Sequence, residues 1–387
     1  MENIYFDSAA TSRMRDEVIK AMSQSMQECY GNPSSTHAFG RKAKSKIEAC
    51  RKDIAKTLKV TPGEIIFTSG GTEADNMVLK CAVFDLGVKR IITSKIEHHA
   101  VLHTVQFLEK QSDIQVDYVS LNSNGQVDLG HLEKLLAESD AKTLVSLMHV
   151  NNEIGNKLDL KTVSELCQKH HALLHSDTVQ SVGHFEMDLE ACPLDFLAVS
   201  AHKFHGPKGV GFAYINKKHK LASLIQGGEQ ERGHRAGTEN VAGIVGLHTA
   251  FNLAYENLEQ ESQYVKSLKQ YFIEKLEDNI EGLVFNGLSK DLEQSTYTVI
   301  NVSLPISEAN AGLLLFQLDL KGIACSQGSA CQSGSQQGSF VLNEIYGPEK
   351  AKTPTLRFSL SHYNTKAEID YTVNVLSEFV GSEKVVV

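Results

Sequence analysis

Residues Phe196 to Gly211 read F-L-A-V-S-A-H-K-F-H-G-P-K-G-V-G, an apolar run that ends abruptly in polar residues and a turn. A continuous apolar run of this length predicts a buried strand of a parallel sheet. In open α/β sheets, ligands bind just beyond the carboxyl ends of the strands, and Lys203 stands at that place. Partial desolvation there lowers the pKa of an amine and makes it nucleophilic toward aldehydes. A solvated loop lysine beside a turn would leave the same local pattern.

Short apolar runs alternate with helical patterns through the first half of the chain. Besides residues 196–199, strands are predicted at Glu64–Thr68, Arg90–Ser94, Val116–Leu121, Leu144–Val150 and Leu173–Asp177. Residues 209–215 predict an edge strand. This rhythm favours an α/β fold with a mainly parallel, seven-stranded sheet that helices cover on both faces.

The length of 387 residues exceeds what one hydrophobic core usually serves, so two domains are expected. A helical stretch from about Ala242 through Leu276 links the two halves. We expect a large domain over residues 15–257. The N-terminal arm, residues 1–14, joins residues 258–387 in a smaller α+β domain whose strands include residues 296–302 and 355–360.

Composition narrows the possible partners and the compartment. The formal net charge is −9 and no long basic run occurs, which argues against a nucleic-acid or anionic-membrane partner. The start of the chain lacks the pattern of a signal peptide, and no apolar stretch approaches membrane-spanning length. Seven scattered cysteines without a CxxC pair predict neither a disulfide framework nor an intrinsic metal site. We therefore expect the reducing cytoplasm.

The stretch Ser69-Gly70-Gly71-Thr72-Glu73 joins a predicted strand to a predicted helix. Free backbone N–H groups and the positive end of the helix dipole meet at such a turn, which makes it an anion site. Neither a GxGxxG fingerprint nor a Walker lysine is present, so neither a dinucleotide nor ATP is indicated. A plain helix cap with a permissive glycine turn is the alternative.

Polar residues recur where the predicted strands end. They are Thr72, Asn152, Asp177, Gln180, Ser200, His202 and Lys203. If Lys203 holds pyridoxal phosphate as a Schiff base, the other parts of such a site are available. Asp177 would keep the pyridine nitrogen protonated, Gln180 would donate to the ring oxygen, and His98 would stack on the ring. Taken singly, Asp177 reads as a helix cap, Gln180 as a surface residue and His98 as a first-turn residue.

Cys331 lies in the stretch Ser326 to Ser335, which is rich in glycine and serine. An exposed free thiol in such a loop is a liability unless it has a reactive role. Composition alone leaves two interpretations of Cys331 open, a functional thiol and a chance occurrence. Cys325 follows Ile323-Ala324, a setting that favours packing in a strand.

Five motifs in fixed order resemble those of the cysteine desulfurases, which are fold-type I, class V aminotransferase-like enzymes. They are T-S-G-G-T-E-A-D-N, M-H-V-N-N-E-I-G, H-S-D-T-V-Q-S-V-G, S-A-H-K-F-H-G-P-K-G and G-S-A-C. The resemblance spans nearly the whole chain, from D-S-A-A-T to L-R-F-S-L. It implies the fold of that class and pyridoxal phosphate as cofactor.

The resemblance also implies a role for each motif residue. Lys203 is the Schiff-base lysine, Asp177 pairs with the pyridine nitrogen, and Gln180 bonds the ring oxygen. His98 stacks on the ring and acts as acid and base. The phosphate is held by Gly71, Thr72, Ser200 and His202. Thr238 matches the threonine that reaches the phosphate of the partner subunit, which implies a homodimer. Arg357 matches the arginine that clamps the substrate carboxylate, and Asn152 lies beside cofactor and substrate.

By the same resemblance, L-cysteine is the substrate and Lys203 removes its α-proton. The Cys331 thiolate attacks the substrate sulfur, which leaves L-alanine and a Cys331 persulfide for an acceptor protein in iron–sulfur cluster or thio-cofactor synthesis. The length of the Cys331 loop resembles that of the long-loop branch, the cysteine desulfurases with a long catalytic loop. The resemblance also implies that Cys331 can be a ligand of an iron–sulfur cluster while the cluster is transferred. The chain ends soon after its last predicted helix, whereas that branch usually extends further, so we expect its scaffold docking to differ.

Two other functions remain open at this point. A selenocysteine lyase or another class V aminotransferase would share most of these residues, but a transaminase would have no use for Cys331. A non-catalytic scaffold of the same fold predicts a substituted Lys203 or Asp177, yet both residues are present.

Overall fold

The computed structural model describes residues 3–328, 338–351 and 353–384. Its largest sheet has seven strands in the order β2-β8-β7-β6-β5-β3-β4. From one edge to the other these are Ile65–Thr68, Gly211–Ile215, Phe196–Ser200, Leu173–Asp177, Thr143–Ser146, Arg90–Thr93 and Gln115–Tyr118. The strands β3 to β7 are parallel, and β8 is antiparallel to both of its neighbours. The predicted seven-stranded, mainly parallel α/β sheet is confirmed.

One detail of that prediction is wrong. Strand β8 is not an edge strand, because it pairs with β7 on one side and with β2 on the other. All five of its residues are buried, as an interior strand requires. The edge on this side of the sheet is β2, which comes much earlier in the chain than its neighbour β8.

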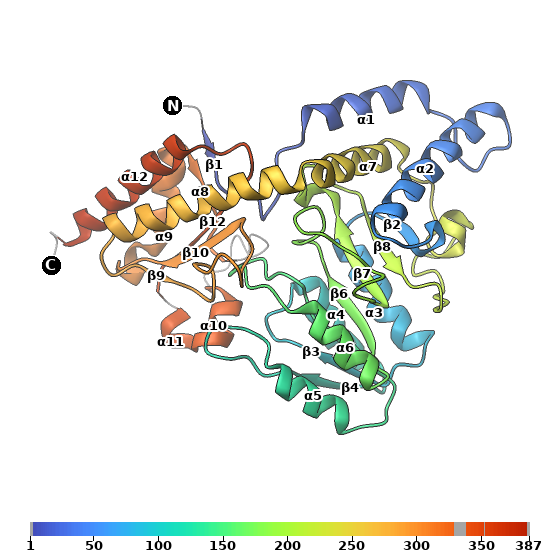
Figure 1. Ribbon diagram of the computed structural model, residues 1–387, viewed down its shortest axis with the longest axis horizontal. Coiled ribbons are helices and arrows are strands. Elements are labelled where there is room, and N and C mark those ends of the chain that lie inside the picture. The colour runs from blue at the N-terminus through green and yellow to red at the C-terminus, as the bar shows by residue number, and fades with distance from the viewer. Residues whose placement is uncertain (1–2, 329–337, 352, 385–387) are drawn as a thin grey trace.

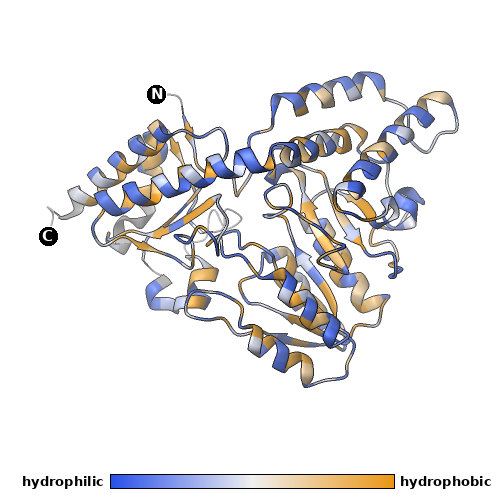
Figure 2. Cartoon of the chain, viewed as in Figure 1, coloured by the Kyte–Doolittle hydropathy of each residue, from blue (hydrophilic) through white to orange (hydrophobic). Residues whose placement is uncertain are grey.

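Helices cover both faces of this sheet (Figure 1). On one face, α3 (Gly71–Phe84) and α4 (His99–Gln111) share a core with residues of β2, β3, β5, β7 and β8. The opposite core contains side chains from α1 (Asp16–Glu28), α2 (Ala38–Thr57), α5 (Leu129–Ala137), α6 (Leu160–Lys169) and α7 (Val241–Glu256). Apolar strands therefore lie inside helices whose outer faces are polar, as the colours of Figure 2 show.

A second core lies around the antiparallel sheet β12-β10-β9. Its strands are Thr355–Ser359, Val299–Ser303 and Val284–Phe285, and a short parallel pair joins β1 (Ile4–Tyr5) to β11 (Ile323–Ala324). Its helices are α8 (Leu258–Asn279), α9 (Glu308–Leu320) and α12 (Lys366–Lys384). Two short helices, α10 (Phe340–Tyr346) and α11 (Pro348–Ala351), lie beside it.

Two segments connect the two cores. Helices α7 and α8 follow one another with a single residue, Asn257, between them, and α8 reaches toward the second core (Figure 1). The N-terminal arm runs the other way, from β1 beside β11 to α1 beside α7. The exact domain boundaries at residues 14/15 and 257/258 stay a prediction. Within the described ranges, no helix is both long and apolar enough to cross a membrane.

Candidate active site

The carboxyl ends of the strands surround a cavity of about 200 Å³. It is lined by Ala9, Ala10, Gly71, Thr72, Asp75, His98, Met148, Asn152, Asp177, Val179, Gln180, Ser200, His202, Lys203 and Arg357. Ten of these are residues that the sequence singled out as candidates. They come from the segments after β2, β3, β5, β6 and β7, and from β12 of the smaller sheet.

Lys203 ends a short 3-10 helix, Ala201–Lys203, directly after β7. Its Nζ donates hydrogen bonds to the backbone oxygens of Ala9, at 2.6 Å, and of Ala10, at 2.9 Å. The N-terminal arm therefore holds the half-buried amine against the cavity wall. The amine remains at the cavity surface, where an aldehyde can reach it.

One end of the cavity suits a phosphate group. Gly71 opens α3, whose first N–H groups have no partner within the helix. A Cβ at Gly71 would stand 2.6 Å from Val179 Cγ2, so only glycine allows this close approach. Burial, helped by Lys203 and Lys208, lowers the pKa of His202 to about 4, so its ring is neutral near pH 7. The neutral ring can donate one hydrogen bond from one nitrogen.

Asp177 ends β6 and is buried. One carboxylate oxygen, Oδ1, accepts a hydrogen bond of 2.9 Å from the Val179 N–H. Burial raises its pKa, while the nearby His98 ring, the Val179 N–H and the Lys203 amine act in the opposite direction. Gln180, one residue further on, donates from Nε2 to Ala9 O at 2.9 Å. A cationic ring nitrogen placed in this cavity would find a carboxylate ready to pair with it.

His98 caps the N-terminus of α4. Its Nδ1 accepts a hydrogen bond of 3.1 Å from the Ala100 N–H. A neutral imidazole that accepts through Nδ1 carries its proton on Nε2. The cap therefore fixes the tautomer, so that Nε2 is the proton-bearing atom of a ring that lines the cavity.

Arg357 of β12 is almost fully buried, at 1% exposure. Its Nη1 donates to Asn152 O at 2.8 Å, and its Nη2 donates to Asp7 Oδ1 at 2.9 Å. The same carboxylate oxygen accepts the Ser326 hydroxyl at 2.7 Å. These partners fix the plane of a guanidinium that lines the cavity, and such a fixed plane recognises carboxylates in a bidentate manner.

The family model of the class-V aminotransferases matches residues 4–372. Cysteine desulfurase IscS of Dictyoglomus turgidum is 41% identical over 379 residues, which are 97% of this chain and 94% of that protein. A putative cysteine desulfurase, IscS 1 of Bacillus subtilis, is 40% identical over 98% of this chain and 99% of its own. This chain belongs to the cysteine desulfurase family of class-V aminotransferases. That family depends on pyridoxal phosphate.

Solved structures agree with the family. A NifS-like protein superposes with a TM-score of 0.88 at 36% identity, covering 98% of this chain and 99% of the other. A structure described as SspA in complex with cysteine superposes with a TM-score of 0.80 at 30% identity, covering 94% and 100%. The predicted family and fold type are thereby confirmed.

The cavity residues fit the desulfurase cofactor. Pyridoxal phosphate needs an amine for its aldehyde, an anion cradle for its phosphate and a carboxylate for its ring nitrogen. Lys203 Nζ, the glycine-lined start of α3 and the buried Asp177 supply these three groups around one cavity. Each role nevertheless stays a prediction for the individual residue.

Two predicted site residues are not among those that line the cavity, one by its position and one because it is not described. Thr238 is exposed, between the 3-10 helix Gln230–Gly233 and α7, and does not line the cavity of its own chain. Cys331 falls outside the described residues. The described residues on either side of its segment lie close together, since a Cβ at Gly328 would stand 3.3 Å from Ser339 Cβ. The Ser339 hydroxyl donates to Glu153 Oε2 at 2.5 Å. Glu153 directly follows Asn152, which lines the cavity.

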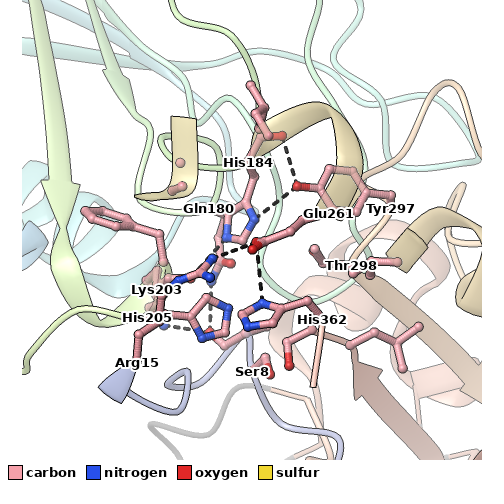
Figure 3. Close-up of a pocket in the computed structure, with 18 residues that line it drawn as sticks. Ser8, Arg15, Gln180, His184, Lys203, His205, Glu261, Tyr297, Thr298 and His362 are labelled. Atoms are coloured by element: carbon pink, nitrogen blue, oxygen red, sulfur yellow. Dashed lines mark hydrogen bonds and ion pairs between the residues drawn. The ribbon is translucent and has the colours of Figure 1, made fainter. Parts of the chain in front are cut away.

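A smaller cavity, of about 30 Å³, lies on the other side of Lys203 (Figure 3). There His184 Nε2 lies 3.0 Å from Lys203 O, and the Tyr297 hydroxyl donates to His184 O at 3.0 Å. Arg15 and Glu261 form an ion pair of 2.6 Å beside them. The small cavity next to Lys203 is thus lined by residues of the arm, of both cores and of α8.

Sequence reasoning missed three parts of this site. The carbonyls of Ala9 and Ala10 hold Lys203, and a backbone carbonyl leaves no residue-type signal. Asp7 holds Arg357, although the motif D-S-A-A-T had been noted. Asp75 lines the cavity at 1% exposure. Its spacing from Thr72, three residues along the same helix, could have indicated it, because such residues share one helix face.

Proposed function

We propose that this chain is a cysteine desulfurase that converts L-cysteine to L-alanine and takes the sulfur as a persulfide on Cys331. The observation that carries the proposal is the cavity itself. In a member of this family, it joins a reactive amine (Lys203), a buried carboxylate (Asp177) and a fixed guanidinium (Arg357). A carboxylate-bearing amino acid is the substrate class that such an arrangement recognises.

We assign the cofactor contacts from the cavity wall. Lys203 would carry the pyridoxal aldehyde, Asp177 the ring nitrogen and Gln180 the ring oxygen, with the His98 ring stacked on the pyridine. The phosphate would be held by Gly71, Thr72, Ser200 and His202, and by Thr238 of a second protomer. When bound, pyridoxal phosphate supplies an electron sink for the substrate α-carbon.

The protein groups then perform the remaining work. Arg357 binds the substrate carboxylate beside Asn152, and Lys203 removes the α-proton as general base. The Cys331 thiolate attacks the substrate sulfur, so that an S–S bond forms and the carbon–sulfur bond breaks. The released carbon takes a proton, for which His98 Nε2–H is the placed donor, and alanine leaves. A thiol of an acceptor protein then accepts the sulfur from the persulfide.

The same function implies a quaternary structure, an acceptor and a compartment. The chain would act as a homodimer, since Thr238 is exposed on its own protomer and free to contact another. The acceptor is a thiol-bearing protein of iron–sulfur cluster or thio-cofactor synthesis, and the compartment is the reducing cytoplasm. The six cysteines among the described residues are all free, in keeping with that compartment.

Product analysis tests the function. The purified holoenzyme is incubated with L-cysteine and a reducing thiol, and alanine and sulfide are quantified together. We expect equal amounts of both, lost in Cys331→Ala and kept in Cys325→Ala. Cys325 is the matched control because burial raises the pKa of its thiol to about 12, which keeps it from forming a thiolate. A keto acid in place of alanine, or full activity in Cys331→Ala, would point to a transaminase or another lyase.

A further inference from the structure

Three carboxyl groups lie buried behind or beside the cofactor cavity. Asp75 of α3 and Glu97 before α4 are each 1% exposed, and Asp177 of β6 is 5% exposed. Asp75 and Asp177 both line the cavity and act on each other electrostatically. Two neighbouring buried carboxylates cannot both ionise cheaply, so one of the pair keeps a proton.

The surroundings of the two aspartates differ in charge. Asp177 receives the Val179 N–H and feels the positive charge of Lys203. The charged groups that act on Asp75 are Asp177 and Glu97, both acidic, and the remaining titratable contact is the ring of His175. Burial and the two acids raise the Asp75 pKa well above its usual range. The shared proton therefore belongs on Asp75.

His175 provides the partner for that proton. It precedes Asp177 by two residues on β6, so both side chains point to the same face of the sheet, toward α3. Its Nε2 lies 3.3 Å from Asp75 Oδ1, and its Nδ1 lies 2.9 Å from Ser146 Oγ. The ring is wholly buried, which lowers its pKa to about 3 and keeps it neutral. The Ser146 hydroxyl can either donate to Nδ1 or accept from it. When it accepts, the neutral ring offers a lone pair at Nε2. Among the described residues, Nε2 and Asp75 Oδ1 are both buried without a hydrogen-bond partner, and a proton on Asp75 would join them.

We propose that Asp75 is a neutral carboxylic acid that donates to His175 Nε2, so that Asp177 alone carries the negative charge of this wall. Asp75 is then a positioning residue that acts through Asp177. If Asp75 were ionised, the proton would pass to Asp177, which could no longer pair as a carboxylate with a protonated ring nitrogen. The functional meaning rests on the proposed cofactor site, whereas the protonation state can be measured without any activity.

Infrared difference spectroscopy of the wild type against Asp75→Asn tests the protonation near neutral pH. Asparagine has the shape of the neutral acid. We expect the wild type to show the carbonyl band of a protonated carboxyl that Asp75→Asn loses, in the apo chain and in the holoenzyme alike. Glu97→Gln is the matched control, since Glu97 is a second buried acid and should remove a different band. Loss of a carboxylate band in Asp75→Asn instead would overturn the proposal.

A second measurement uses only the wild type, so it tests the proposal even if Asp75→Asn does not fold. With ¹³C-labelled aspartate carboxyls, the wild type should show one aspartate that keeps the chemical shift of the protonated acid near neutral pH. All aspartates at the carboxylate shift would refute the assignment.

Cofactor binding tests the link to Asp177. A neutral Asp75 predicts that Asp75→Asn binds pyridoxal phosphate within about twofold of the wild type, because no charge is lost. A weakening of about tenfold or more, equivalent to about 1.4 kcal/mol, would mean that an ionised Asp75 had been removed. A protonated Asp75 in a chain that makes no alanine would refute the desulfurase function alone.

Discussion

The two halves of the cavity are built in different ways. The cofactor half consists of residues at the ends of strands of one sheet or shortly after them, such as Asp177 and Lys203, so the sheet topology brings their side chains together. The substrate half joins Arg357 to Asp7 and to Asn152, across 350 and 205 residues of chain. The large sheet alone places the side chains of the first half, and the arm adds only the carbonyls of Ala9 and Ala10 that hold Lys203 and Gln180. The second half exists only when both cores and the arm have met. Chemistry and substrate binding should therefore respond separately to substitution.

The largest expected effect is in the cofactor half. Lys203→Ala removes the single amine among the described cavity-lining residues, and turnover of cysteine should fall by about 10³-fold or more, since both the covalent link and the general base are lost. Alanine formation measures the loss. Lys208→Ala, an exposed lysine in the same segment, should retain activity. A residual rate above about a tenth of the wild type would show that another group can do the work of Lys203.

The next effect should fall on the substrate half alone. Arg357→Lys keeps the charge but loses the planar fork, and we expect the KM for cysteine to rise about 10- to 100-fold, or about 1.4–2.7 kcal/mol. Pyridoxal phosphate should bind as before. Steady-state kinetics and a cofactor titration separate the two effects. A loss of cofactor affinity with an unchanged KM would contradict the division into halves.

A smaller effect is expected from the arm. Asp7→Asn keeps an acceptor for Arg357 but removes its ion pair, and the KM should rise about fivefold, the equivalent of about 1 kcal/mol for one charge-assisted hydrogen bond. Ser326→Ala removes the other partner of Asp7 and should change the KM less. If Ser326→Ala had the larger effect, the loop before Cys331 rather than the ion pair would orient Arg357.

A last effect concerns the stability of the cofactor half and not its activity. Burial raises the pKa of Glu97 to about 8, while in the unfolded chain it is near 4.5. Between these values the folded state keeps a proton that the unfolded state releases. Stability therefore falls as pH rises through this range, by at most about 1.4 kcal/mol per pH unit for one proton.

Glu97→Gln cannot release a proton, so that component of the slope should vanish while activity near neutral pH remains. Urea unfolding at pH 6 and pH 8 measures the slope in both chains. Glu109→Gln, on the exposed side of α4, serves as control and should keep the wild-type slope. An equal slope in the wild type and in Glu97→Gln would show that Glu97 is ionised throughout.

The sequence predicted the cofactor half better than the substrate half, for a physical reason. Residues at strand ends can be recognised in the sequence, because an apolar run such as residues 196–199 stops at polar residues. In a parallel sheet, such polar residues lie at the edge where ligands bind. Strand order carries no such local signal, which is why β8 was expected at an edge. The resemblance supplied Arg357, but its contact with Asp7 depends on how two cores meet. Asp75 was missed because its neighbours, His175 and Asp177, lie about a hundred residues away.

The contacts of the N-terminal arm determine when the active site is completed during synthesis of the chain. The arm is made before the large sheet, yet β1 pairs with β11 and the Ala9 N–H donates to Ser359 Oγ, both of which are made after that sheet. The large sheet can fold much earlier, since domains fold as they emerge. We therefore expect an unfinished chain to display its lysine without the carbonyls of Ala9 and Ala10 fastened against it. The reactive centre is therefore complete only after the residues up to Ser359 have been made.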